Sequence, residues 1–226
     1  DRRKRIKEYM AKNAPTKYRF AGINIPTVRK SFKQLYSGDF KFRDQQETFE
    51  KIWFNSELFE EALLSLYWLE SQSLEVLITE YKKILRWSER IDNWAHSDGY
   101  SSILAKLYEV RPDLLDEDFK KWRVSPNPWL RRLSLVSLLY YSRMRTKYPK
   151  YKDLVLAIQN LMNDEDYYVQ KGVGWTLREV YNLYPDETFK FMLRNAKSIH
   201  PAAWYAVTEK LSKEEKLQIK RLRFAK

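Results

Sequence analysis

Two stretches of the same pattern decide the fold: NPWLRRLSLVSLL at 127–139 and DYYVQKGVGWTLR at 166–178. Each opens on a polar residue, continues through an aromatic residue and a Leu or Val to polar and basic residues, and then runs on as a helix. The two stretches lie 39 residues apart, close to the period of about 40 to 47 residues seen in solenoids of helix pairs. This spacing favours a chain of stacked helix pairs.

The remaining sequence also favours an all-α protein. Apolar residues recur at helical spacing almost throughout, and no segment alternates as a strand does. We expect helices at 1–13, 26–37, 43–55, 57–71, 73–86, 90–110, 115–123, 128–146, 151–162, 165–184, 186–197, 201–211 and 213–223. No linker divides 1–226, so the prediction is one α-helical repeat domain, a HEAT-like α-solenoid superhelix with a basic concave face.

Charge and composition limit the classes of function. Lysine and arginine exceed the acidic residues by 42 − 30 = 12, which favours nucleic acid as the partner and an anionic membrane surface as the alternative. The absence of cysteine excludes disulfides, thiolate zinc sites and cysteine nucleophiles. No apolar run approaches the roughly 18 residues of a membrane span. We therefore expect a cytoplasmic protein, associated with the nucleoid when bound to DNA.

The helix expected at 165–184 carries an apolar stripe on one face and a tryptophan on the other. The stripe consists of Val169, Val173, Leu177, Val180 and Tyr184. Opposite it lies Trp175, with Lys171 one turn before and Arg178 nearly one turn after. Glycine costs about 1 kcal/mol against alanine inside a helix, so the two glycines beside Trp175 indicate a close neighbour. Trp175 either faces outward amid positive charge or packs on an adjacent repeat.

The helix expected at 90–110 repeats this arrangement with an acid. Its apolar stripe consists of Tyr100, Ile103, Leu107 and Val110, and the opposite face of Trp94, Asp98, Ser101 and Ala105. A lone carboxylate near a helix start is often a cap or a surface charge. However, a carboxylate in a groove that binds DNA repels the phosphates and weakens binding. If Asp98 faces such a groove, we therefore expect it to have a chemical role. His96 falls on the core side and is interpreted as a packed histidine.

The helix expected at 128–146 is apolar over most of its circumference, as in a helix inside a stack. Arg132 and Arg143 fall along one line on it. Arginine suits bidentate contact with phosphate, and the alternative role for Arg132 is a salt bridge between helices.

Five motifs carry a resemblance to a known family: EYM at 8–10, FAGINIPTVRK at 20–30, NWAHSD at 93–98, NPWLRRLSL at 127–135 and VQKGVGWTLREVYNLYP at 169–185. In order and spacing they resemble the HEAT-like-repeat DNA alkylation repair proteins, the alkylpurine DNA glycosylases. The resemblance implies a superhelix that holds duplex DNA and hydrolyses the glycosidic bond of cationic N3- and N7-alkylated purines. It also implies that the damaged nucleotide is not drawn into a deep pocket, unlike ordinary base flipping.

The resemblance also implies roles for individual residues. Trp94 and Asp98 match the catalytic pair, Trp175 the second aromatic wall, Tyr9 a tyrosine of the groove, and Arg132 a phosphate-binding arginine. Lys171 and Arg178 are expected to hold the DNA backbone without reading sequence. Indole rings attract a cationic base, and a carboxylate stabilises the positive charge that develops on the sugar. This chemistry needs no metal or organic cofactor, and we expect none.

The chain departs from the family pattern at three places. The family commonly has an aspartate directly after the catalytic tryptophan, where this chain has Ala95. The N-terminal helix before EYM is expected to be truncated. The weakly charged aromatic segment SIHPAAWYAV at 198–207 stands in place of a basic helix. Fewer cations in the groove imply weaker affinity for DNA.

Three functions therefore remain open. The first is a monomeric DNA glycosylase acting on alkylpurines in duplex DNA. The second keeps the basic groove without catalysis and recognises bent or branched DNA by shape. The third is a scaffold for protein interactions. Trp94 and Asp98 favour the first over the second, because shape recognition needs no carboxylate, and the net charge favours either over the third.

Overall fold

A computed structural model describes residues 2–13, 16–36 and 42–225 of the chain. These residues are helical or irregular: Arg19 and Leu58 form an isolated parallel bridge, and no strand occurs among them. The chain divides into two compact units, Asp1–Ile103 and Leu104–Lys226. Because helix α7 (Trp94–Val110) contributes residues to both units, a single repeat domain stays a prediction.

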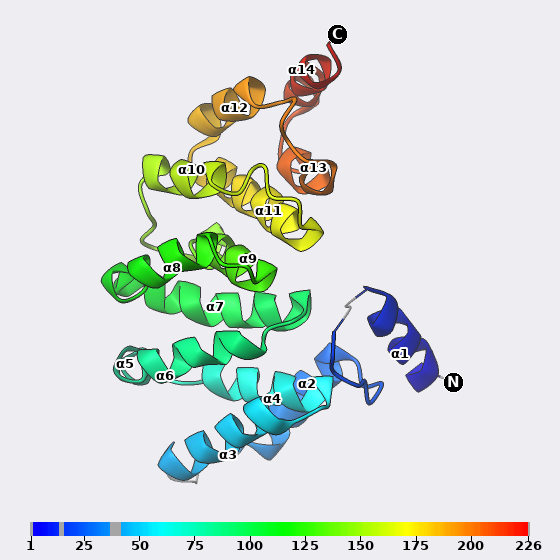
Figure 1. The fold of residues 1–226 in the computed structure, drawn as a ribbon, viewed down its shortest axis with the longest axis vertical. Coiled ribbons are helices and arrows are strands. Elements are labelled where there is room, and N and C mark those ends of the chain that lie inside the picture. The colour runs from blue at the N-terminus through cyan, green and yellow to red at the C-terminus, as the bar shows by residue number, and fades with distance from the viewer. Residues whose placement is uncertain (1, 14–15, 37–41, 226) are drawn as a thin grey trace. The chain divides into compact units, whose positions relative to one another are not determined.

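Short helices follow one another along both units (Figure 1). Before α7, the first unit contains α1 (Arg2–Asn13), α2 (Ile25–Leu35), α3 (Phe42–Asn55), α4 (Phe59–Glu70), α5 (Leu74–Thr79), α6 (Tyr81–Arg86) and the 3-10 helix η1 (Trp87–Arg90). After α7, the second contains η2 (Pro112–Leu114), α8 (Asp116–Arg123), α9 (Pro128–Val136), η3 (Ser142–Met144), α10 (Tyr151–Gln159), α11 (Tyr167–Leu183), α12 (Pro185–Arg194), α13 (Pro201–Thr208) and α14 (Lys213–Phe224).

Three buried tryptophans form the centre of the first unit. Trp53 stacks on Trp87 with ring centroids 5.3 Å apart, and Trp68 stacks on the same ring at 6.4 Å. Each indole can be buried because its N–H has a partner: Trp53 Nε1 donates to the Trp87 carbonyl at 3.0 Å and Trp68 Nε1 donates to Gln45 Oε1 at 3.2 Å. This aromatic cluster is the support on which α7 begins.

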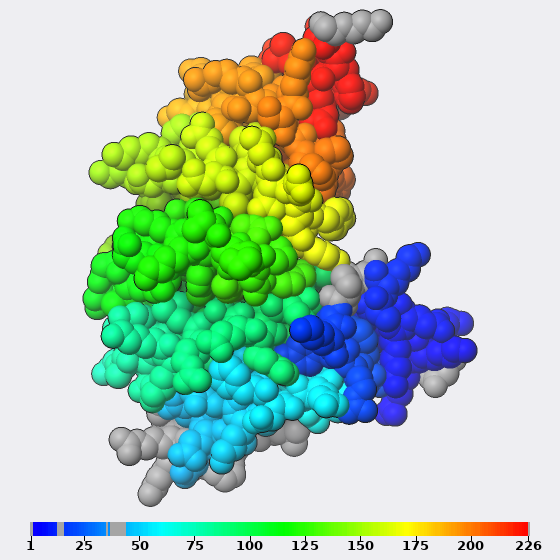
Figure 2. Space-filling model, viewed as in Figure 1, coloured from blue at the N-terminus to red at the C-terminus, as the bar shows by residue number. Residues whose placement is uncertain are grey.

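The repeat expected from sequence is present in the second unit as two matching sets of hydrogen bonds. Arg131, in α9, donates from Nη1 to the Ser125 carbonyl at 2.8 Å. Gln170, 39 positions later in α11, donates from Nε2 to the Asp164 carbonyl at 2.6 Å. In both repeats the side chain reaches back six residues to the preceding turn. In Figure 2 the colours of the second unit follow one another in space from green to red. Segments that follow one another in the sequence therefore lie next to one another in this unit, as stacked repeats do.

Arg131 also joins the two repeats to one another. Its guanidinium forms a bidentate ion pair with Asp164, from Nε to Oδ2 at 2.6 Å and from Nη2 to Oδ1 at 3.1 Å. The side chains of this pair are about one-fifth and less than one-tenth exposed, respectively. Because a bidentate pair fixes orientation as well as distance, it sets the register of α9 against the start of α11.

Most expected helices differ from the structure by a few residues at their ends, and two are wrong by more than this. The helix expected at 128–146 ends at Val136, and Tyr141 has the left-handed φ of 56°. The physical reason is a partner far along the chain. The backbone N–H of Ser142 donates to Glu179 Oε2 at 2.8 Å, whereas in a continuing helix it would donate to the carbonyl four residues earlier. The helix expected at 73–86 breaks at Glu80 into α5 and α6, where no glycine or proline marks the break.

Candidate functional site

A buried asparagine sets the start of α7. The Asn93 side chain accepts from the His96 backbone N–H at 2.9 Å, which satisfies one of the free amides of the first turn. Its Nδ2 donates to Asp92 Oδ1 at 3.0 Å, and Asp92 in turn accepts from the Thr16 hydroxyl at 2.6 Å. This chain of bonds fixes the place of Trp94, the first residue of the helix.

His96 is the packed histidine expected from sequence. Its side chain is 0 % exposed, and its ring stacks on Phe59 with centroids 4.5 Å apart. Nε2 lies 3.2 Å from the Phe59 carbonyl and Nδ1 lies 2.9 Å from Asn93 Nδ2, so the neutral tautomer with its proton on Nε2 satisfies both contacts. Burial lowers the pKa of His96 to about 4. The histidine therefore stays neutral and acts as support beneath the first turn.

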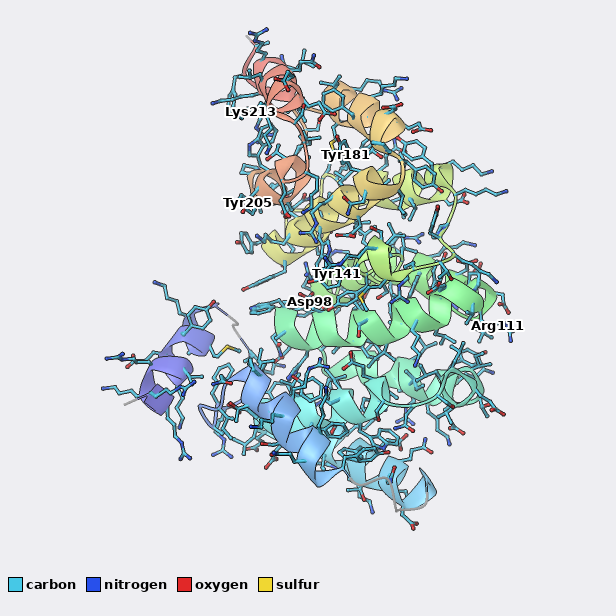
Figure 3. The ribbon with its side chains drawn as sticks, turned by 180° about the vertical axis from the view of Figure 1, so that it is seen from behind. Asp98, Arg111, Tyr141, Tyr181, Tyr205 and Lys213 are labelled. Carbon is cyan, nitrogen blue, oxygen red and sulfur yellow. The ribbon has the colours of Figure 1, made fainter. Side chains whose placement is uncertain are left out.

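Trp94 and Asp98 lie above this support and are both half-buried. Figure 3 shows Asp98 at the N-terminal end of α7. Ser101 and Ala105, further along the same face of the helix, are buried.

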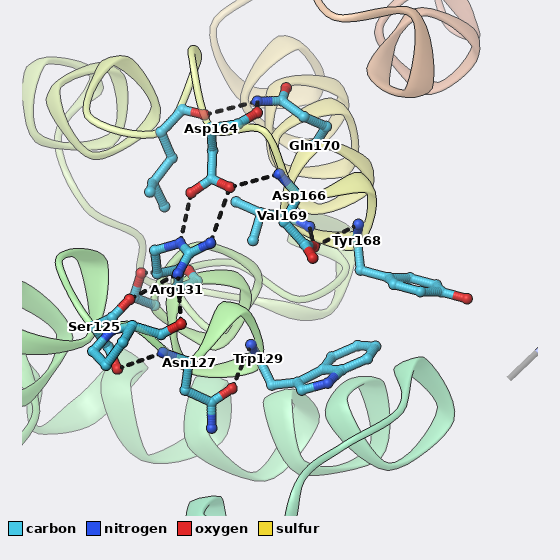
Figure 4. Close-up of polar contacts among 12 residues, drawn as sticks. Ser125, Asn127, Trp129, Arg131, Asp164, Asp166, Tyr168, Val169 and Gln170 are labelled. Carbon is cyan, nitrogen blue, oxygen red and sulfur yellow. Dashed lines mark hydrogen bonds and ion pairs between the residues drawn. The ribbon is translucent and has the colours of Figure 1, made fainter. Parts of the chain in front are cut away.

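The same local design recurs at α9 and α11 (Figure 4). Asn127 caps α9 by accepting from the Trp129 N–H at 2.9 Å, and Asp166 caps α11 by accepting from the Tyr168 N–H at 2.8 Å. The rings of Trp129 and Tyr168 project to the same side with centroids 4.9 Å apart. The two helix starts thus present a joined aromatic surface.

A charged residue stands five positions after each of the three caps. These residues are Asp98 in α7, Arg132 in α9 and Lys171 in α11. Trp175 is not at this position but one turn further along α11. Lys171, which is half-buried, is therefore the residue of α11 equivalent to Asp98 and Arg132 in its place on the helix.

Arg132 is 3 % exposed and bonded within the fold. Its Nη1 donates to the Tyr168 carbonyl at 2.8 Å. Gly172 provides room for it, because a Cβ on Gly172 would lie 3.3 Å from both Cγ and Nη1 of Arg132. The structure thus places Arg132 between α9 and α11, and its contact with phosphate stays a prediction.

Trp175 packs against two tyrosines from the segment after α9. Its ring centroid is 5.2 Å from that of Tyr140 and 5.3 Å from that of Tyr141. Its Nε1 donates to Glu179 Oε1 at 3.2 Å. Trp175 was expected either to face outward or to pack on an adjacent repeat. The structure contains something of both, because the indole is half-buried and lies against this neighbouring segment.

Glu179 is a central residue of this region that sequence reasoning missed. It is 4 % exposed and accepts from the Ser142 N–H and hydroxyl, both at 2.8 Å. Burial alone would raise the pKa of Glu179, but the bonds from Ser142 and the ion pair with Arg178 outweigh burial and lower it. Glu179 is therefore an ionised residue that fixes the segment carrying Tyr141.

Arg178 is neutralised by two carboxylates. It pairs with Glu179 at 2.8 Å and with Glu209 at 2.9 Å, and its guanidinium lies 5.5 Å from the ring centre of Trp175. The structure therefore gives Arg178 partners within the fold, and its contact with the DNA backbone stays a prediction. Tyr9, on α1, is 62 % exposed.

The residues expected at a site form three local groups in the structure. Trp94 and Asp98 share the start of α7, Arg132 meets Gly172 beside Lys171, and Trp175 shares partners with Arg178. Among the described residues no cluster of His, Cys, Asp and Glu is suited to hold a metal ion. A search of the same residues finds no helix with the length and hydropathy of a membrane span.

Comparison with known proteins identifies relatives over almost the whole chain. A family profile described as "DNA alkylation repair enzyme" matches residues 1–211. No curated protein matches significantly in sequence. A structure described as a predicted DNA alkylation repair enzyme from Enterococcus faecalis is similar with a TM-score of 0.71 and 19 % identity, over 93 % of this chain and 94 % of that one.

Two structures from Streptococcus mutans are also similar. One, AlkD2, has a TM-score of 0.56 and 17 % identity, over 84 % of this chain and 91 % of its own. The other, smu.31 of strain UA159, has a TM-score of 0.53 and 17 % identity, over 99 % and 96 %. These likenesses confirm the all-α helical-repeat fold expected from sequence.

Proposed function

The chain belongs to the DNA alkylation repair enzyme family, and from this premise we propose that it is a DNA glycosylase. Its proposed substrates are duplex DNA bases alkylated at N3 or N7 of a purine. The proposed catalytic residues are Asp98 and Trp94, with DNA held through Tyr9, Lys171 and Arg132. The proposal rests on the start of α7, where a carboxylate and an indole lie one turn apart on a fixed, neutral support.

The residue types at this site fit the reaction. A purine alkylated at N3 or N7 carries formal positive charge, so it leaves the sugar without a strong general acid. The bond between C1′ and the base nitrogen breaks with both electrons going to the base, and C1′ develops positive charge. The Asp98 carboxylate stabilises that charge or orients the water that adds to C1′, and this water loses a proton to solvent.

The indole of Trp94 contributes to recognition of the damaged base. Its face attracts a cation, by about 0.5 to 2 kcal/mol depending on desolvation. An undamaged purine carries no such charge, so this contact discriminates between damaged and undamaged bases. Because Asn93 and His96 fix the first turn of α7, the backbone that carries Trp94 needs little ordering when DNA binds.

A second function is supported by the packing of Trp175. Its indole already contacts Tyr140 and Tyr141, and the charge of its neighbour Arg178 is matched by two carboxylates. A protein with this second aromatic wall engaged in its own fold could bind bent or branched DNA without excising a base. The two functions differ in whether the protein excises a base in a reaction that requires Asp98.

Base release from methylated duplex DNA distinguishes the two functions. The assay separates 3-methyladenine from 7-methylguanine and compares the wild type with Asp98→Asn. Asp113→Asn is the matched control, because Asp113 is an exposed carboxylate in η2. Release that is lost in Asp98→Asn and kept in Asp113→Asn supports the glycosylase. Salt-dependent binding to the same duplex without any base release would instead support the non-catalytic function.

A further inference from the structure

The second unit contains a cavity of about 560 Å³ that the proposed reaction does not use. It lies between the end of α7, the helices α8 and α10, and the segment that leads into α10. Its volume falls within the range of about 300 to 1,000 Å³ typical of small-molecule sites. Five basic side chains line it: Lys120, Arg123, Lys147, Lys150 and Lys152.

Arg123, the last residue of α8, has an incompletely satisfied charge. Its Nε is buried without a hydrogen-bond partner, and Arg123 forms no ion pair within 4.0 Å among the residues that the structure describes. Burial lowers the pKa of Arg123, and the interactions with Tyr108 and Asp116 offset this only in part. Burying a cation is costly unless it is paired, so a bound anion would stabilise this side chain.

The three acidic residues of the cavity leave its positive charge in excess. Glu109 accepts from Arg145, from Thr146 and from the Lys147 N–H, so its charge is held by groups in the wall. Asp116 accepts from the Tyr108 hydroxyl at 2.8 Å. Asp153 is exposed at the start of α10. Lys120 pairs with Glu117 at 2.6 Å, and the remaining basic residues, Arg123, Lys147, Lys150 and Lys152, still outnumber the three acidic ones and favour an anionic ligand.

The cavity also has an apolar and aromatic wall beside its basic residues. Tyr148 is 46 % exposed and Leu156 is 59 % exposed, and both line it together with Pro112 and Pro149. A single phosphate ion would leave this wall and much of the volume empty. A nucleic-acid base stacks favourably on an aromatic ring, so this wall suits a base, just as the basic residues suit a phosphate.

We propose that this cavity binds the phosphate group of a nucleotide, with Arg123 paired to the phosphate and Tyr148 offering its ring to the base. Lys147, Lys150 and Lys152 surround the phosphate as mobile point charges, whereas arginine supplies two parallel donors. The phosphate belongs either to a free nucleoside monophosphate or to the phosphorylated end of a DNA strand. The site is independent of base excision, because it includes none of the residues at the start of α7.

Calorimetric titration of the full chain with AMP, adenosine and inorganic phosphate at low salt tests the proposal. We expect AMP to bind and adenosine to bind at least about tenfold more weakly, because adenosine lacks the phosphate and hydrogen bonds to charged groups are the stronger ones. Arg123→Gln should weaken AMP binding by a similar factor. Lys121→Gln is the matched control, because Lys121 is exposed in the same helix and outside the cavity.

Further arms identify the source of the phosphate. Competition with AMP by a 5′-phosphorylated oligonucleotide, but not by its unphosphorylated form, supports the strand end; the absence of competition, with AMP bound, supports the free nucleotide. Equal affinity for AMP and adenosine, no AMP binding at millimolar concentration, or an Arg123→Gln variant that binds normally overturns the proposal.

Two further variants keep this test independent of folding and of the proposed reaction. If Arg123→Gln loses its helical circular dichroism, the variant with Lys147, Lys150 and Lys152 all changed to Gln takes its place, since all three side chains are exposed. AMP binding that is unchanged in this variant also overturns the proposal. Asp98→Asn should bind AMP normally, so a failure of the glycosylase assay and a failure of this site are distinguishable.

Discussion

Gly174 of α11 lies directly against the backbone of Ala203 in α13: a Cβ built on Gly174 would be 2.6 Å from the Ala203 carbonyl oxygen and 2.8 Å from its Cα. Real Cβ atoms do not approach backbone atoms so closely, and a backbone cannot rotate away as the end of a side chain does. The glycine is therefore required by the packing of two helices, which offsets its cost within α11.

Gly174→Ala should therefore destabilise the protein. The added methyl forces α11 and α13 apart, and we expect a loss of about 2 kcal/mol in the free energy of unfolding, as is usual for overpacking in a closed core. Urea denaturation measures it. Gly99→Ala is the control, because its Cβ would meet only Leu66 Cδ1 at an ordinary 3.5 Å. An equal loss in both variants would contradict the assigned role of Gly174.

Glu179→Gln should destabilise the protein by removing the charge that holds Arg178 and Ser142. Taking one partner from a buried ion pair typically costs about 3 to 5 kcal/mol, and the partial exposure of Arg178 places this change near or below the lower end of that range. Thermal and urea unfolding measure the loss. Glu165→Gln is the control, since Glu165 is exposed. A variant as stable as the wild type would show that the network contributes little to folding.

Helical periodicity predicted most of the buried stripes of α11 and α7, although Val110 at the end of the α7 stripe is 38 % exposed. Val169, Val173 and Leu177 are buried as the wheel requires, and so is His96. The 39-residue repeat also corresponds to equivalent caps and equivalent hydrogen bonds. These features depend on residues within one or two turns of each other, which is the range over which a sequence pattern carries information.

The features that sequence could not predict depend on partners far along the chain. Glu179 bonds Ser142 from 37 residues away, and this contact ends the helix that the apolar pattern at 128–146 predicted to continue. Arg178, which we expect to hold the DNA backbone, pairs with Glu209, 31 residues beyond it. The cavity beside Arg123 collects residues from 108 to 157. No periodicity connects such positions, so only the fold reveals them.

The stability of the protein should fall in mild acid because His96 is buried as a neutral ring. Its pKa is lowered by burial to about 4 from an ordinary value of 6.5, so between these values the unfolded chain binds the proton and the folded chain does not. The contribution of the neutral His96 ring to the free energy of unfolding is complete above pH 6.5. It is lost as the pH falls towards 4, to a total of about 3 kcal/mol.

Unfolding by urea at several pH values from 7.5 to about 4.5 measures this loss. The pH dependence of His96→Gln should be flatter over the same window, because glutamine does not titrate, while the other acidic groups contribute equally to both proteins. NMR titration of the His96 ring in the wild type checks the pKa directly and does not depend on the variant folding. A ring that titrates near 6.5 would contradict the assignment of a neutral, buried histidine.

Lys171 and Arg178 lie two turns apart on α11 and should differ in their effect on DNA binding. Each lysine or arginine that neutralises a phosphate adds about 0.9 to the slope of log Kobs against log salt concentration. Lys171 stands at the position after the helix cap that Asp98 and Arg132 occupy in their helices, whereas two carboxylates already match the charge of Arg178. We expect Lys171→Gln to lower the magnitude of the slope by about one unit, and Arg178→Gln to change it by less than half as much. Binding to a short duplex over a series of salt concentrations gives both slopes, with circular dichroism to show that each variant is folded.

The reverse order, with the larger change in Arg178→Gln, would mean that DNA displaces Glu179 or Glu209 from the arginine and that these ion pairs open on binding.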